Sequence, residues 1–152
     1  MSIDVRLLSA PFDATAEIDH FVGSHGDSGA LVTFLGQVRS NDDDAARVEA
    51  LELRHYEPLT LAGMRGQASL AFDRWDLEGI LVIHRVGCMV PTDPIVLVAA
   101  AARHRRDAFA ATDFLMDHLK SDAWFWKREK AGGQWRWVEP RDVDFADLAR
   151  WQ

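Results

Sequence analysis

The only three lysines of the chain are Lys120, Lys127 and Lys130, which fall within eleven residues of one another. Lys120 follows a helical pattern, and a lysine in the last turn of a helix ordinarily complements the helix dipole. Lys127 lies among aromatic residues, where a partly desolvated lysine has a lowered pKa that suits proton transfer or covalent chemistry. The clustering therefore predicts a local cationic site, with chance as the simpler alternative.

The segment around Lys127 has the composition of a strand with two different faces. Side chains alternate across a strand, so the pattern predicts one face with Phe125, Lys127 and Glu129. The opposite face then carries Trp124, Trp126 and Arg128. Core packing is the commoner role of such tryptophans, and it remains an alternative here.

Residues 103–106, Arg-His-Arg-Arg, stand where an apolar strand ends and a helix begins. The first turn of a helix offers free N–H groups and the positive end of the dipole. With His104 and Arg105 added, this turn is suited to a phosphate group. A solvated basic turn explains the same residues equally well.

A third candidate is Arg39, which closes the apolar segment 34–38. The polar, acidic residues 40–46 follow it and predict a mobile loop without an apolar anchor. An arginine beside a mobile loop suits the mouth of a site for an anionic ligand. A strand-end arginine is more often simply solvated.

Other chemistry-bearing residues give weaker patterns. The six histidines show no paired spacing of the kind that binds a metal, and His84, in an apolar strand, is expected to be a satisfied core residue. The single cysteine, Cys88, follows a glycine and is a candidate nucleophile, although a buried single cysteine is more often inert. The chain contains no glycine-rich nucleotide loop and no G-x-S-x-G sequence.

Composition limits the class of protein. With 152 residues and 48% hydrophobic residues the chain has the size and composition of one globular domain, 1–152, without a linker or an internal repeat. A formal net charge of −7 argues against a general nucleic-acid binder. The sequence has no apolar run of about 20 residues and no signal-peptide pattern, which predicts a cytoplasmic protein.

Hydrophobic periodicity predicts an α+β fold with a mixed or mainly antiparallel sheet and flanking helices. Gly132 and Gly133 predict the turn of a β-hairpin, and residues 87–94, with two prolines, predict a loop. The predicted strands are 3–8, 30–38, 48–56, 80–86, 95–102, 123–130 and 134–139, and the predicted helices are 14–22, 58–75, 106–120 and 143–150.

Together, several segments resemble the large, catalytic subunit of molybdopterin synthase. The resemblance runs from about residue 2 to about residue 151, with its blocks in the family's order. The matching segments are GALVTFLGQVRS (29–40), VEALELRHY (48–56), ILVIHRVG (80–87), HRRDAF (104–109), DFLMDHLK (113–120), FWKRE (125–129) and WVEPR (137–141). No single segment is specific, but the set is.

The resemblance implies an α/β-hammerhead type of α+β fold and a homodimer of large subunits, each with a small ubiquitin-like subunit, giving a heterotetramer. The small subunit is expected to carry a C-terminal Gly-Gly thiocarboxylate, the sulfur donor. The reaction would convert cyclic pyranopterin monophosphate (precursor Z) to molybdopterin by transfer of two sulfurs. No metal and no bound cofactor is implied, because the partner chain brings the sulfur.

The resemblance also assigns roles to residues. It makes Lys120 and Lys127 catalytic, and it places the substrate on Gln37, Val38, Arg39, His104, Arg105, Arg128, Glu129 and Arg141. The chain departs from the family pattern at Gln37, where a lysine is expected, and in the unusually acidic residues 42–44. Both departures concern the mouth of the pocket. A single pocket that draws residues from both halves of the dimer remains open at this point.

Two other functions remain open on the sequence alone. One is a sulfurtransferase that uses Cys88 as its own persulfide carrier. The other is a non-catalytic binding module for a ubiquitin-like protein or an anionic ligand. The sequence does not assign the separate roles of the two lysines or the order of the two sulfur transfers.

Overall fold

The computed structural model describes residues 2–121 and 124–152, and its elements follow the order that periodicity predicts. The strands are β1 (Ser2–Leu8), β2 (Ala30–Gln37), β3 (Ala50–His55), β4 (Leu77–Arg85), β5 (Gly87–Met89), β6 (Pro94–Ala102), β7 (Phe125–Ala131) and β8 (Gln134–Val138). The helices are α1 (Ala14–Ser24), α2 (Leu59–Arg74), α3 (Arg105–Ser121) and α4 (Asp142–Ala149).

Two differences from the predicted elements stand out. The short strand β5 lies inside residues 87–94, which were predicted to form a loop, because Gly87, at φ 91°, turns the chain so that these residues pair with β3. The predicted strand 123–130 begins at Phe125 in the structure, and its first residue, 123, lies outside the described residues.

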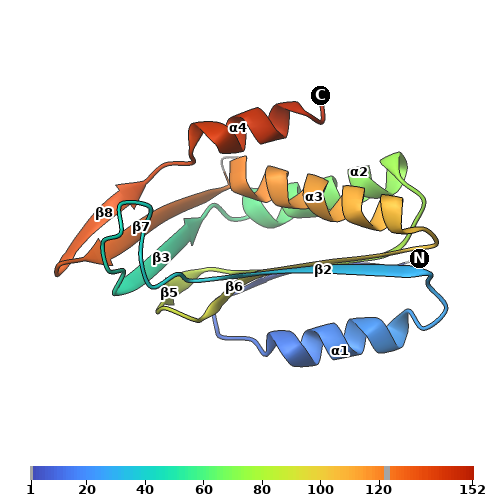
Figure 1. Ribbon diagram of the computed structural model, residues 1–152, viewed down its shortest axis with the longest axis horizontal. Helices are drawn as coiled ribbons and strands as arrows, with labels where there is room; N and C mark the ends of the chain where they lie inside the picture. The colour runs from blue at the N-terminus through green and yellow to red at the C-terminus, as the bar shows by residue number, and fades with distance from the viewer. Residues whose placement is uncertain (1, 122–123) are drawn as a thin grey trace.

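The first sheet has the strand order β1-β4-β6-β2 and forms most of the core. Its central strands, β4 and β6, are antiparallel and almost wholly buried, and only β1 runs parallel to its neighbour. Helices α2 and α3 cover one face of this sheet and α1 covers the other, while α4 lies on the outside of α3 (Figure 1). A strand buried on both faces needs apolar side chains throughout, which explains the unbroken apolar run of β6.

The predicted face of α3 holds this helix on the sheet. Ala108, Ala111, Leu115 and Leu119 recur at helical spacing and are all buried. Helix α3 packs on β6 and β2, and its axis follows the length of the first sheet (Figure 1). The C-terminal end of α3 is thereby fixed at the end of the sheet where β6 begins and β2 finishes.

The second sheet, with the order β5-β3-β7-β8, is antiparallel throughout and lies at that end of the first sheet (Figure 1). Strands β7 and β8 form the predicted hairpin, with Gly132 and Gly133 both at positive φ. The α+β class with mainly antiparallel sheets is therefore confirmed, with two sheets rather than one.

Packing of Trp124 ties the start of β7 to helix α2. The hydroxyl of Thr60 donates a hydrogen bond of 2.9 Å to the carbonyl oxygen of Trp124. The indole ring lies against Gly63, where a Cβ atom would come within 2.5 Å of it. A glycine at position 63 weakens the helix pattern, but it leaves room for the ring of Trp124, which directly precedes β7.

Candidate functional site

The fold brings the ends of β2 and α3 to the same place. Strand β2 is antiparallel to β6, so Gln37 lies opposite Pro94, where β6 begins. Helix α3 follows β6 and runs back over the sheet, so Lys120 returns to this end as well. Arg39 and Lys120, far apart in sequence, therefore flank the junction with the second sheet, which carries Lys127.

Four basic side chains form what we call the cationic cluster: Arg39, Lys120, Lys127 and Arg141. Although Lys120 reaches the surface, the surrounding protein removes enough water to lower its pKa from the ordinary value of 10.5. The like charge of Lys127 lowers this pKa next, and Arg141 and Arg39 lower it further, against the opposing effect of Asp144.

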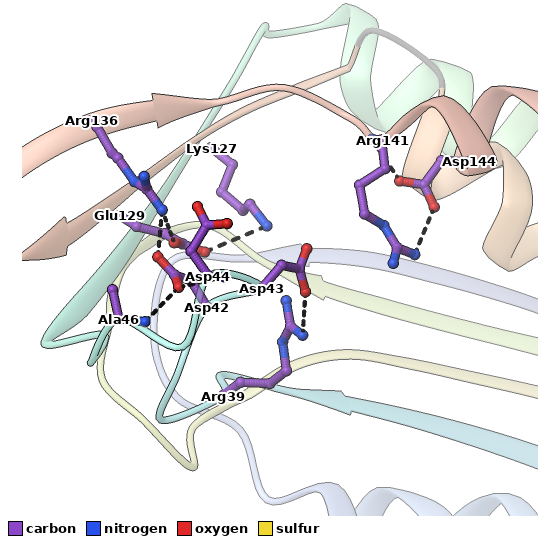
Figure 2. Close-up of polar contacts among 10 residues, drawn as sticks. All are labelled: Arg39, Asp42, Asp43, Asp44, Ala46, Lys127, Glu129, Arg136, Arg141 and Asp144. Atoms are coloured by element: carbon purple, nitrogen blue, oxygen red, sulfur yellow. Dashed lines mark hydrogen bonds and ion pairs between the residues drawn. The ribbon is translucent and has the colours of Figure 1, made fainter.

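Carboxylates hold three of these cations in place (Figure 2). Lys127 Nζ lies 3.7 Å from the buried carboxylate of Glu129, on the same face of β7. Arg39 donates to Asp43 at 2.9 Å, and Arg141 contacts Asp144 at 3.3 Å in the first turn of α4. The Arg39–Asp43 pair is solvent-exposed on both sides, so it is weak and exchangeable for an incoming anion, whereas the carboxylate of Asp144 is largely covered.

His84 lies beneath this cluster and was expected to be a satisfied core residue. Its ring is buried, stacks on Phe125 with the centroids 4.0 Å apart, and has Nδ1 2.9 Å from the carbonyl oxygen of Arg85. Burial lowers the pKa of His84 to about 4, and the charge of Lys120 lowers it too. His84 is therefore neutral at pH 7 and lies close enough to Lys120 to sense its charge.

His104 and Arg105 are not part of this cluster within one chain. Both are exposed and stand at the first turn of α3, whereas Lys120 stands in its last turn. A helix rises about 1.5 Å per residue, so about 24 Å separates His104 from Lys120 along the axis. One copy of the chain does not bring the expected anion-binding pair to the lysines.

Three further residues that the resemblance assigns to the substrate, Gln37, Val38 and Arg128, lie in three different surroundings. Gln37 is exposed at the end of β2, beside the cluster, but Val38 is a core residue packed with Val48 and Met89. Arg128 lies on the opposite face of β7 from Lys127, where it bonds Glu52 at 2.8 Å and lies over the ring of Trp135. The structure therefore brings neither the Val38 nor the Arg128 side chain into the cluster.

Cys88 is exposed rather than buried, contrary to the expectation for a single inert cysteine. It pairs with Glu52 across β3, so it lies on the face of Arg128, away from Lys127. Its Sγ is 3.7 Å from Glu52 Oε2, and hydrogen bonds from Arg128 and then Arg54 lower the pKa of Glu52 to about 2. The thiol therefore faces a permanently ionised carboxylate rather than the cationic cluster.

The sequence did not single out Asp43 as part of the site. The acidic run 42–44 was visible, but only the spacing of four residues between Arg39 and Asp43 hints at their contact. The structure also gives this segment a hydrogen-bonded form, whereas a mobile loop was predicted.

A cavity of about 630 Å³ lies elsewhere, between β1 and α1 at the end of the first sheet away from Lys120. Acidic side chains outnumber basic ones among its lining residues, so it does not suit anionic reactants. Within residues 2–121 and 124–152, no three histidine, cysteine, aspartate or glutamate side chains gather as metal ligands would. None of the helices in these ranges is long and apolar enough to span a membrane.

The fold and the cluster define an α+β protein with four basic side chains gathered at the junction of two sheets. Residues 7–122 match the family model described as MoaE protein. Over 147 residues the chain is 45% identical to a molybdopterin synthase catalytic subunit of Ralstonia nicotianae, covering 97% of this chain and 83% of the relative. A relative of the same name from Cereibacter sphaeroides is 44% identical, with 97% and 99% covered.

A solved structure shows the same likeness. The molybdopterin biosynthesis MoaE protein of Burkholderia ambifaria has 41% sequence identity and a TM-score of 0.79, covering 98% of this chain and 97% of that one. The chain therefore belongs to the MoaE family, whose curated relatives are named molybdopterin synthase catalytic subunits. The resemblance predicted from the sequence segments is confirmed.

Proposed function

We propose that this chain is the catalytic subunit of a molybdopterin synthase in molybdenum cofactor biosynthesis. It converts cyclic pyranopterin monophosphate to molybdopterin by two transfers of one sulfur each, every sulfur coming from the C-terminal thiocarboxylate of a small ubiquitin-like subunit. The observation that carries the proposal is the cationic cluster, which gathers Arg39, Lys120, Lys127 and Arg141 from distant parts of an otherwise acidic chain. Family membership and the relatives' name, which specifies one subunit of a larger enzyme, support it.

The cluster suits this reaction because both reactants are anions. A pterin phosphate and a thiocarboxylate repel each other, and a site that holds them in contact must offset that repulsion. The four cations of the cluster do so, and the Arg39–Asp43 pair is exposed enough to be exchanged for a reactant.

The two lysines have different surroundings and therefore different roles in the proposal. Lys120 has a lowered pKa, so a larger fraction of its amine is neutral at a given pH and available for proton transfer at the thiocarboxylate. Lys127 is held by the buried Glu129 and assists as a positioned positive charge.

The substrate phosphate is assigned to His104 and Arg105 from a second copy of the chain, together with Arg39. Strand β2 is an edge of the first sheet, with Phe34 and Leu35 exposed in its middle. An edge strand is a template for pairing with another strand. Antiparallel pairing of two β2 edges about this midpoint sets the Ala30 end of one copy against the Gln37 end of the other.

That pairing completes the site. The Ala30 end of β2 lies beside the start of α3, since Ala30 pairs with Ala102 and Gly29 packs on the backbone of Arg103. The partner copy would therefore bring its His104 and Arg105 to the Arg39 and Lys120 of the first. The proposal includes this homodimer, a small subunit on each half, residues 1–152 as one domain, and a cytoplasmic location.

The direct experiment mixes the purified chain with thiocarboxylated small subunit and cyclic pyranopterin monophosphate, and assays dithiolene product. Formation of product supports the proposal, and its absence with correctly loaded small subunit contradicts it. The variant Cys88→Ala tests the alternative in which Cys88 carries the sulfur as a persulfide. Because Cys88 faces away from Lys127, this variant should keep full activity. A scaffold without catalysis would instead bind the small subunit and yield no product.

A further inference from the structure

The acidic segment 40–47, here called the aspartate loop, is built around Asp42. Asp42 Oδ1 accepts the backbone N–H groups of Asp44 at 2.9 Å and Ala46 at 2.8 Å. The backbone N–H of Asp42 donates to the carbonyl oxygen of Ala46 at 2.8 Å, and Ala45 adopts φ 62° to close the turn. The loop therefore has a defined shape in which Asp42 faces inward.

A chain of ionic contacts fixes the aspartate loop on the second sheet. Asp42 Oδ2 accepts from Arg136 of β8, and its side chain is almost fully buried. Arg136 also lies 4.0 Å from Glu129, the carboxylate that holds Lys127. The loop is thus anchored through Asp42 to the strands that carry the proposed catalytic lysine.

This anchoring presents Asp43 to the cationic cluster. Asp43 Oδ1 accepts a hydrogen bond of 2.9 Å from Arg39, and Figure 2 shows the carboxylate between Arg39, Lys127 and Arg141. The hydrogen bond from Arg39 lowers the pKa of Asp43 from 3.8, and the charges of Arg141 and Lys127 act in the same direction. Asp43 is therefore an anion located where an anionic reactant is needed.

We propose that Asp43 competes with the substrate phosphate for Arg39 and so determines how tightly, and how selectively, this site takes its pterin substrate. The inference rests on the proposed function and specifies one residue of that site. A phosphate dianion carries more charge and more oxygens than a carboxylate, so it displaces Asp43 from an exposed pair. A weak monoanion does not, which makes Asp43 a filter against small carboxylates.

The test compares Asp43→Asn with Asp44→Asn, a matched change one residue away at an exposed position. Binding of inorganic phosphate to the whole chain is measured by calorimetry, with acetate as the monoanion. Removing an exposed competing charge should tighten phosphate binding by about three- to ten-fold and lower the KM for the pterin substrate in Asp43→Asn. Acetate should gain at least as much, and Asp44→Asn should match the native chain.

Unchanged or weaker phosphate binding in Asp43→Asn overturns the inference. So does a gain confined to the affinity for thiocarboxylated small subunit, because Asp43 would then compete with the donor and not with the phosphate. In an Arg39→Met background, Asp43→Asn should have no further effect, and an undiminished effect there also contradicts the proposal. Failure of the proposed function is distinguishable, because it leaves the phosphate measurements intact while no variant forms dithiolene.

Discussion

His104 and Lys120 lie at opposite ends of the same helix, α3, about 24 Å apart along its axis. Both belong to the site that the family resemblance implies, and one chain cannot bring them together. In the proposed function, this separation makes the homodimer necessary for activity, since only a second copy of the chain can supply His104 and Arg105 to the lysines of the first.

The side chain of Lys120 should be essential for turnover and dispensable for folding. Loss of a positioned proton-transfer group typically costs about 10²- to 10⁴-fold in rate, so Lys120→Ala should lose activity on that scale. The measurement is single-turnover formation of dithiolene, together with small-subunit binding, which should persist. Lys130→Ala is the matched control, because Lys130 lies on the opposite face of β7 from Lys127.

Near-native turnover in Lys120→Ala would contradict the assignment of Lys120 as a catalytic residue. Equal losses in Lys120→Ala and Lys130→Ala would point to a general effect of charge rather than to the cluster.

The pKa of Lys120 should be measurable directly, because the chain has only three lysines. Selective ¹³C labelling of lysine and an NMR titration should show one amine below the ordinary value of 10.5. Lys127→Met removes a neighbouring like charge and should raise this pKa, moving the basic limb of the pH profile to higher pH. Lys130→Met should leave it in place. A Lys120 amine that titrates at or above 10.5 would remove the basis for its role in proton transfer.

His84 should make the fold sensitive to acid. Its pKa of about 4 lies below the unfolded value of 6.5, so between these values the unfolded chain binds the extra proton and stability falls as the pH falls. The difference corresponds to about 3 kcal/mol at 1.36 kcal/mol for each pKa unit. Urea unfolding at pH 7 and pH 4.5 should show a smaller loss in His84→Gln than in the native chain.

His20→Gln is the control for that experiment, because His20 is exposed. An equal acid sensitivity in the native chain and in His84→Gln would show that His84 is not the buried neutral group described above.

The sequence predicted much of the fold because periodicity reports which face of an element is buried. The faces of residues 125–129 and the apolar stripe of α3 follow from spacing alone, and both are observed. The sequence did not predict strand β5 because three residues are too few to show the alternation of apolar and polar side chains that indicates a strand. Its pairing also depends on the turn at Gly87. Exposure of Cys88 was missed for the same reason.

The candidate site was predicted less completely than the fold. Residue patterns singled out Lys120, Lys127 and Arg39, the family resemblance added Arg141, and the structure gathers all four. The resemblance also assigned Arg128 to the substrate, but its side chain lies on the face of β7 opposite Lys127, as strand alternation predicted. Contacts across the junction of two sheets, such as Asp43 with Arg39 and Asp42 with Arg136, depend on tertiary packing that spacing does not encode.

The most direct test of a shared site is complementation between two inactive variants, Arg105→Ala and Lys120→Ala. Co-expression with two different tags allows the mixed dimer to be isolated, and one of its two pockets then contains no substituted residue. The mixed dimer should regain about half of the native activity, since a two-fold dimer has two equivalent sites. A mixed dimer that is as inactive as its parents would contradict the shared cationic pocket.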